Sequence, residues 1–176
     1  MEVYRIHMGK AKCAVDLGDG RERGEYVDQD YILAKMGRPH RSISLMYCYY
    51  PLDEGWPGRA SVVHASPDVS FAWDYPYDDY FTYKGGLGGS TDGEPFNYMR
   101  EIRQHGQDVS LTLTIDPHVS DEHLAAIGED LKSFGRVFLR INHEATGNWF
   151  SFNKRCTYQE VADFFVRASR IIKEHA

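Results

Sequence analysis

The segment 137–150 most constrains what this chain folds into, because an apolar run passes directly into a dense cluster of polar and aromatic groups. The run Val137–Ile141 is a predicted strand. Four polar residues lie at or just beyond its end, namely Arg140, Asn142, His143 and Glu144. In parallel α/β folds, catalytic groups gather at the carboxyl ends of strands. The sequence therefore predicts an active site here.

The adjacent pair His143 and Glu144 allows several interpretations. A zinc protease needs a second histidine one helical turn after the first, but position 147 is glycine and a strand precedes the pair, so this interpretation fails. A carboxylic acid beside a histidine, an arginine and a tryptophan is instead typical of glycoside cleavage, in which one carboxyl group protonates the leaving oxygen. The structural alternative is that Glu144 only pairs with Arg140 at a strand end.

A family resemblance rests on this same segment. The pattern Arg140, His143, Glu144, Gly147, Trp149 and Phe150 resembles the acid/base motif of glycoside hydrolase family 26, the β-mannanases and related β-glucanases. The resemblance implies that Glu144 is the general acid/base and that His143 and Arg140 shape the pocket around it. It also implies that Trp149 and Phe150 bind the sugar. The family usually has asparagine where Thr146 stands and an aromatic residue where Ser151 stands, which leaves the substrate open.

Strand and helix patterns alternate along the chain, which favours an α/β fold with a parallel sheet. The patterns predict strands over 3–8, 43–50, 109–115 and 137–141, and helices over 26–36, 94–105, 120–134 and 157–174. The last helix begins with a capping box, Thr157 and Glu160. The resemblance implies a (β/α)8 TIM barrel of which residues 1–176, a single partial catalytic domain, cover the first four βα units. A complete barrel takes about 250 residues, so we expect a half-barrel.

This expectation has consequences for the mechanism and for assembly. A retaining glycosidase needs a second carboxylate as nucleophile, and the resemblance implies that it lies on strand seven, outside this chain. The nucleophile is therefore unassigned. Asp53, Glu54 and Asp116 at the other strand ends are interpreted as loop groups or pocket liners. A half-barrel would also leave unpaired edges and an open apolar face, lined by leucines such as Leu111 or by their alternating neighbours, so we expect self-association.

A long loop over about 51–93 carries an unusual number of aromatic residues. Aromatic faces suit sugar rings, and Trp56, Trp73 and Tyr75 are the candidates for substrate binding. Most of the other rings are expected to pack a satellite core beneath the loop. The loop aspartates lack the spacing of a calcium motif, so no metal is expected.

Composition excludes several other classes of function. The 20 basic and 26 acidic residues give a net charge of −6, and no basic stripe supports nucleic-acid binding. No apolar stretch is long enough to span a membrane, and charged residues among the first fifteen exclude a signal-peptide core. The sequence does not determine the cellular location of the protein. We expect a secreted enzyme whose signal peptide is absent from this chain. The three cysteines have no paired spacing, and no cofactor is expected.

Two functions from different classes follow. The first is hydrolysis of a β-linked polysaccharide, β-mannan first and β-glucan second, by acid/base catalysis with retention. The alternative is a non-catalytic carbohydrate-binding protein, or an inactive fragment of such an enzyme, that keeps the aromatic cleft but lacks the second carboxylate.

Overall fold

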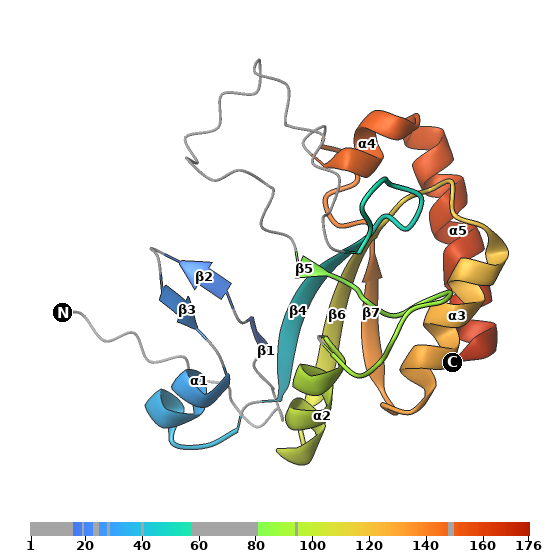
Figure 1. Cartoon of the computed structure of the whole chain (residues 1–176). Helices are drawn as coiled ribbons and strands as arrows, with labels where there is room; N and C mark the ends of the chain where they lie inside the picture. The colour runs from blue at the N-terminus through green and yellow to red at the C-terminus, as the bar shows by residue number, and fades with distance from the viewer. Residues whose placement is uncertain are drawn as a thin grey trace, which may run out of the picture.

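A parallel sheet forms the centre of the molecule. The computed structural model describes residues 16–18, 20–22, 25–27, 29–39, 41–57, 81–93, 95–147 and 150–176. Three strands, β4 (Ser42–Tyr49), β6 (Asp108–Ile115) and β7 (Val137–Ile141), pair in parallel in that order. Two short strands, β1 (Asp16–Gly18) and β5 (Phe81–Thr82), also pair in parallel with β4 (Figure 1). Within the described residues β7 is thus the last strand on its side of the sheet.

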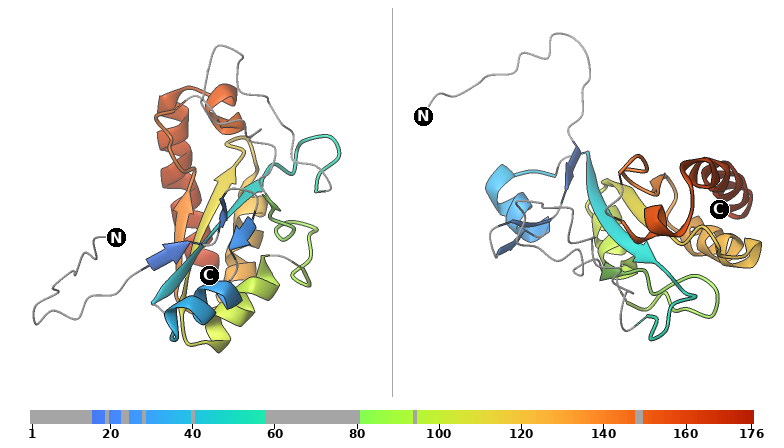
Figure 2. Two further views of the ribbon diagram at one scale, coloured as in Figure 1. Left: turned by 90° about the vertical axis from the view of Figure 1, so that its left-hand side faces the viewer. Right: turned by 90° about the horizontal axis from the view of Figure 1, so that it is seen from above.

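Five helices and a small hairpin complete the described structure. The helices are α1 (Gln29–Met36), α2 (Phe96–Gln104), α3 (Asp121–Lys132), α4 (Ser151–Arg155) and α5 (Tyr158–His175). Strands β2 (Gly20–Glu22) and β3 (Glu25–Val27) form a separate antiparallel pair. Helices α3 and α5 lie side by side at the β7 side of the sheet, whereas α1 lies at the opposite side (Figures 1 and 2).

One face of the sheet supplies the main hydrophobic core. Alternate residues of the long strands, including Leu45, Leu111 and Leu113, are buried against apolar residues of α2, α3 and α5. The other face is more polar, because Ser44, Ser110 and Phe138 form one cross-strand row and Met46, Thr112 and Arg140 form the next. The leucines therefore face the helices, and their alternating neighbours lie on the other face of the sheet, where Thr112 and Thr114 are also buried.

The glycine-rich loop after β5 is fastened to α3. The carboxylate of Asp130 accepts hydrogen bonds from the Tyr83 hydroxyl at 2.9 Å and from the Gly86 amide at 2.6 Å. Burial raises the pKa of Asp130, and burial together with the charge of Asp130 raises the pKa of Tyr83. The Tyr49 hydroxyl accepts from the Leu87 amide at 3.2 Å, so one side chain of α3 and one of β4 hold this loop in place.

The prediction of a TIM half-barrel with four βα units is wrong. The sheet has three long parallel strands, and within the described residues three helices pack on the core after them: α2 follows β4 and the short β5, α3 follows β6, and α5 follows β7 and α4. The expected first unit is replaced, within the described residues, by the three-residue strand β1, the hairpin of β2 and β3, and α1. The molecule is an α/β structure built on a small parallel sheet.

Most of the individual elements agree with their predictions. Strand β7 has the predicted bounds, and α5 begins with the predicted capping box, in which the Thr157 side chain accepts from the Glu160 amide. The predicted helix over 26–36 begins only at Gln29, because residues 25–27 form β3. The predicted strand over 3–8 lies outside the described residues.

Candidate functional site

Polar residues follow each of the three long strands where they end. Asp53 lies four residues beyond β4, Asp116 directly follows β6, and the run from Asn142 to Glu144 directly follows β7. Because parallel strands end at the same edge of a sheet, these groups share one end of the molecule. This end is the candidate site.

The turn after β7 is held in an uncommon backbone conformation. Asn142 and Glu144 have φ values of 52° and 53°, in the left-handed region that residues with a Cβ atom seldom occupy. Two hydrogen bonds fix Asn142 to the neighbouring strand β6: its amide donates to the Leu113 carbonyl at 2.9 Å, and its Oδ1 accepts from the Ile115 amide at 2.6 Å. Backbone strain of this kind is concentrated at functional sites.

Glu144 projects from this turn in contact with His143. The Nε2 atom of His143 lies 3.1 Å from Oε1 of Glu144, and Nη1 of Arg140 lies 3.1 Å from Nδ1 of His143. The Glu144 side chain is 47% exposed and that of His143 is 26% exposed. The carboxyl group can therefore meet a ligand from solvent while the imidazole holds it from one side.

The chain of contacts fixes which nitrogen of His143 carries the proton. An arginine N–H can only donate, so Nδ1 of His143 must accept from Arg140. The proton of the neutral imidazole is then on Nε2, which donates to Oε1 of Glu144. When Glu144 is itself protonated, its proton must be on Oε2, the oxygen that does not face the imidazole.

A small aromatic cluster supports His143 from behind. Phe150 is only 4% exposed; its ring stacks on Phe152 at 5.7 Å and meets the edge of the His143 ring at 5.9 Å. Phe150 was expected to bind substrate, and the structure places it behind the histidine instead. Asn153 on α4 donates to the Ala145 carbonyl at 2.9 Å, which ties the turn to that helix.

Arg155, at the end of α4, joins the ends of the other two strands. Its guanidinium donates to both oxygens of Asp53 at 2.9 and 2.8 Å and to Oδ2 of Asp116 at 2.5 Å. It also lies over the Tyr50 ring, 4.6 Å from the centroid. Burial alone would lower the pKa of Arg155, but the hydrogen bond to Asp53 and the charges of both carboxylates raise it overall.

The buried carboxylate of Asp116 has a second partner. Its Oδ1 accepts from the backbone amide of His118 at 2.9 Å and contacts Nδ1 of the His118 ring at 3.0 Å. Every oxygen of Asp116 is therefore engaged, and the same holds for Asp53. These carboxylates hold the strand ends together and are not free to attack a substrate.

One buried donor of the site has no acceptor within the described residues. Asn142 is 4% exposed and its Oδ1 is bonded to β6, but its Nδ2 has no hydrogen-bond partner there. A buried amide of this kind is unfavourable unless a water molecule or a ligand oxygen accepts from it. It is the polar group of the turn that most requires a further partner.

The remaining predicted site residues are placed as follows. Trp56 is partly buried and meets Tyr49 edge to face at 5.6 Å, so it packs on the core with part of its surface exposed. Trp73, Tyr75 and Trp149 lie outside the described residues. Sequence reasoning missed Arg155, since no local pattern distinguishes it from other arginines of the chain.

The described residues contain no group of three or more His, Cys, Asp or Glu side chains placed to hold a metal ion. Among these same residues, no helix is both long and apolar enough to cross a membrane. Cys48 is buried, and burial raises the pKa of its thiol to about 12, which leaves it unsuited to nucleophilic chemistry at neutral pH.

Comparison with known proteins adds no family to this geometry. The chain matches no family model, no curated protein and no solved structure.

Proposed function

We propose that the chain hydrolyses glycosidic bonds, with Glu144 as general acid/base. The contact between His143 Nε2 and Glu144 Oε1 carries the proposal, because it orients a half-exposed carboxyl group at the end of a parallel strand. Such a group can give a proton to a leaving oxygen and later remove one from water. The resemblance of the segment around Glu144 to family 26 favours β-mannan as substrate, with β-glucan second.

The hydrogen bonds assign a role to each of the three residues. Glu144 gives the proton on Oε2 to the glycosidic oxygen, and the carboxylate that forms still accepts from His143 on Oε1. His143 therefore stabilises the state that exists after proton transfer, and Arg140 keeps the imidazole in the required tautomer. As the leaving group departs, the sugar forms a bond to the nucleophile; in the second step the Glu144 carboxylate removes a proton from the water that displaces this nucleophile from the sugar.

The nucleophile is not assigned. Retention requires a second carboxylate about 5 to 5.5 Å from the acid. Two of the other strand-end carboxylates, Asp53 and Asp116, are both engaged by Arg155. This observation favours the second candidate, a carbohydrate-binding protein that does not cleave its ligand.

Reducing-sugar release from β-mannan tests the proposal. In an enzyme that also supplies the second carboxylate, which the resemblance implies lies outside this chain, the parent should release product and Glu144→Gln should not, because glutamine keeps the shape of the side chain but has no transferable proton. With an aryl mannoside whose leaving group is activated, the first step should be partly spared in this variant, since that group leaves without protonation. Glu122→Gln, an exposed change on α3, is the matched control.

The result also distinguishes the two candidate functions. Release by the parent that persists in Glu144→Gln would remove Glu144 from the role. Binding of β-mannan by the parent without any release, measured by affinity electrophoresis, would favour the carbohydrate-binding protein.

A further inference from the structure

Strand β7 presents an unpaired backbone edge within the described part of the chain. The amide of Asn142 donates to the Leu113 carbonyl of β6. Along a strand, the backbone N–H and C=O groups of successive residues point alternately to the two sides, here toward β6 and away from it. The N–H and C=O groups of Phe138 and Arg140 therefore point toward β6 as well. Those of Val137, Leu139 and Ile141 point outward, where no described strand pairs with them.

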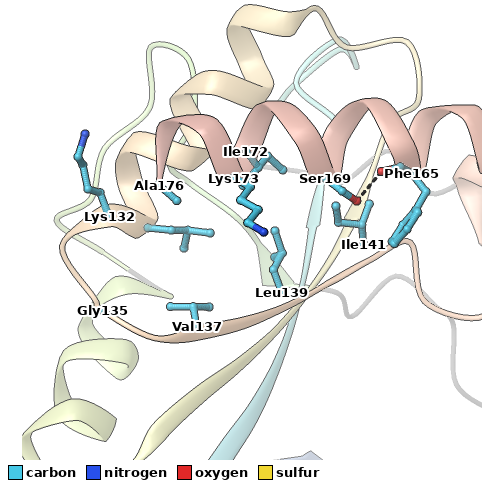
Figure 3. A pocket seen from close by; sticks show the side chains of 11 residues that line it. Lys132, Gly135, Val137, Leu139, Ile141, Phe165, Ser169, Ile172, Lys173 and Ala176 are labelled. Carbon is cyan, nitrogen blue, oxygen red and sulfur yellow. Dashed lines mark hydrogen bonds between the residues drawn. The ribbon is translucent and has the colours of Figure 1, made fainter.

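An apolar groove lies along the same edge. Val137, Leu139 and Ile141 line it from β7, and Phe165 and Ile172 line it from α5 (Figure 3). Its volume is about 360 Å³. The residues whose outward backbone groups have no partner among the described strands thus also have their side chains in the groove. On the other face of the sheet, Phe138 is 55% exposed beside this edge.

One lysine side chain lies over the groove. Lys132 and Lys173 belong to its lining, which contains no aspartate or glutamate. Figure 3 shows the Lys173 side chain extending over the groove toward Leu139, whereas Lys132 points away. Lys132 lies 3.5 Å from Glu129, but Lys173 has no ion-pair partner among the described residues. A ligand with a carboxylate at this position would supply one.

We propose that the β7 edge and its groove bind an extended, acidic peptide segment of a partner protein, which adds to the sheet as a further strand. Alternate apolar side chains of the segment fill the groove, and a carboxylate on the same side of the segment pairs with Lys173. The intervening side chains lie over Phe138. The outward backbone groups of β7 supply the hydrogen bonds of the new ladder.

The observations favour a peptide strand over two other occupants. A long-chain carboxylate could fill the groove and pair with Lys173, but it would leave the outward groups of three β7 residues unpaired. The β7 strand of a second copy carries no carboxylate that could pair with Lys173. It contains Arg140 and follows directly after Arg136, so it would bring further positive charge to this lysine.

Synthetic peptides and backbone NMR test the proposal on the full chain. The probe is a short peptide in which valines alternate with threonines and one groove-facing valine is replaced by glutamate; a second peptide has lysine at that position. The glutamate peptide should shift the amide signals of Val137, Leu139 and Ile141, whose N–H groups point outward, more than those of Phe138 and Arg140.

Charge reversal supplies the sharper test. Lys173→Glu should weaken binding of the glutamate peptide on the order of fivefold and strengthen that of the lysine peptide. Lys84→Glu, an exposed change on the loop after β5, should leave both affinities unchanged. Binding of decanoate but of neither peptide would overturn the proposal in favour of a lipid-like ligand. Concentration-dependent dimerisation that Lys173→Glu leaves intact, with no peptide binding, would overturn it in favour of a second copy.

Discussion

Arg155 binds Asp53 through two parallel hydrogen bonds, although 102 positions separate them in the sequence. This fork connects α4, which follows β7, to the loop that follows β4, and the bond to Asp116 adds the end of β6. Since Asn153 on the same helix holds the Ala145 carbonyl, the turn that bears Glu144 is fastened to the other two strand ends through α4. Rigid support of this kind is what the role proposed for Glu144 requires.

Replacing Arg155 should therefore destabilise the protein. Arg155→Met removes the cation and leaves two carboxylates that are only 13% and 4% exposed, which should lower the free energy of unfolding by about 3 kcal/mol. Arg155→Lys should have an intermediate effect, because an ammonium keeps the charge but cannot form the fork. Urea unfolding measures the free energy of unfolding of both variants. The control is Arg170→Met, which removes an exposed ion pair on α5 and should change this free energy by less than about 0.5 kcal/mol. Equal effects at both positions would contradict the proposed role of Arg155.

The tautomer of His143 provides a second prediction. In the parent protein, Nδ1 should be unprotonated and Nε2 protonated in the neutral imidazole, because Arg140 donates to Nδ1. The ¹⁵N chemical shifts of the ring report this directly. Arg140→Met should remove the preference and give a mixture of tautomers, whereas Arg170→Met should not. A parent protein with the proton on Nδ1 would exclude the assigned chain of hydrogen bonds.

Local patterns in the sequence predicted those elements that local interactions determine. Strand β7 was recognised from its apolar run, and the start of α5 from Thr157 and Glu160, which bond to each other within one turn. Strand β3 was not recognised from the sequence, because Glu25–Val27 is extended only through its pairing with β2. The sequence there carries no signal that separates it from the start of a helix.

The architecture and the support of the site depend on distant contacts. An apolar β-strand has the same pattern in a barrel and in a small open sheet, so neither the number of strands nor barrel closure could be inferred from Leu111 or its neighbours. The position of Glu144 and His143 at a strand end could be predicted from order along the chain. The role of Arg155 could not, because its partners Asp53 and Asp116 lie far away in the sequence.

Two glycines of the loop after β5 should differ in their tolerance of alanine. Gly86 has φ of 80°, and a Cβ there would overlap the hydroxyl of the buried Tyr49, whereas Gly88, with φ of 70°, has open space around it. Gly88→Ala should therefore lower stability only through backbone strain, by roughly 1 kcal/mol. Gly86→Ala should lower it by at least about 1 kcal/mol more, because Tyr49 must move. Thermal unfolding of the two variants measures this difference. Equal losses of stability in both would show that the loop and Tyr49 move apart at no cost in free energy.

Asp108 should make stability depend on pH in acid. It begins β6 and accepts hydrogen bonds from Arg136 and from Arg41, and these lower its pKa from 3.8 to about 2. A carboxyl group whose pKa is lower in the folded state stabilises the fold above its unfolded pKa and loses that effect as pH falls through the folded value. The stabilisation should thus be complete above pH 3.8 and disappear below about pH 2.

The variant Asp108→Asn isolates this contribution. It should lower the free energy of unfolding by roughly 1 to 2 kcal/mol at pH 7, since a neutral amide cannot replace the charge-assisted bonds to partly exposed arginines. The difference between parent and variant should narrow as pH falls from 3.8 toward 2, where the parent carboxyl group is also neutral. Asp163→Asn, at an exposed position of α5, should show no such convergence. A difference that stays constant from pH 7 to pH 2 would mean that asparagine perturbs the packing at this strand end and that the charge of Asp108 has little part in stability.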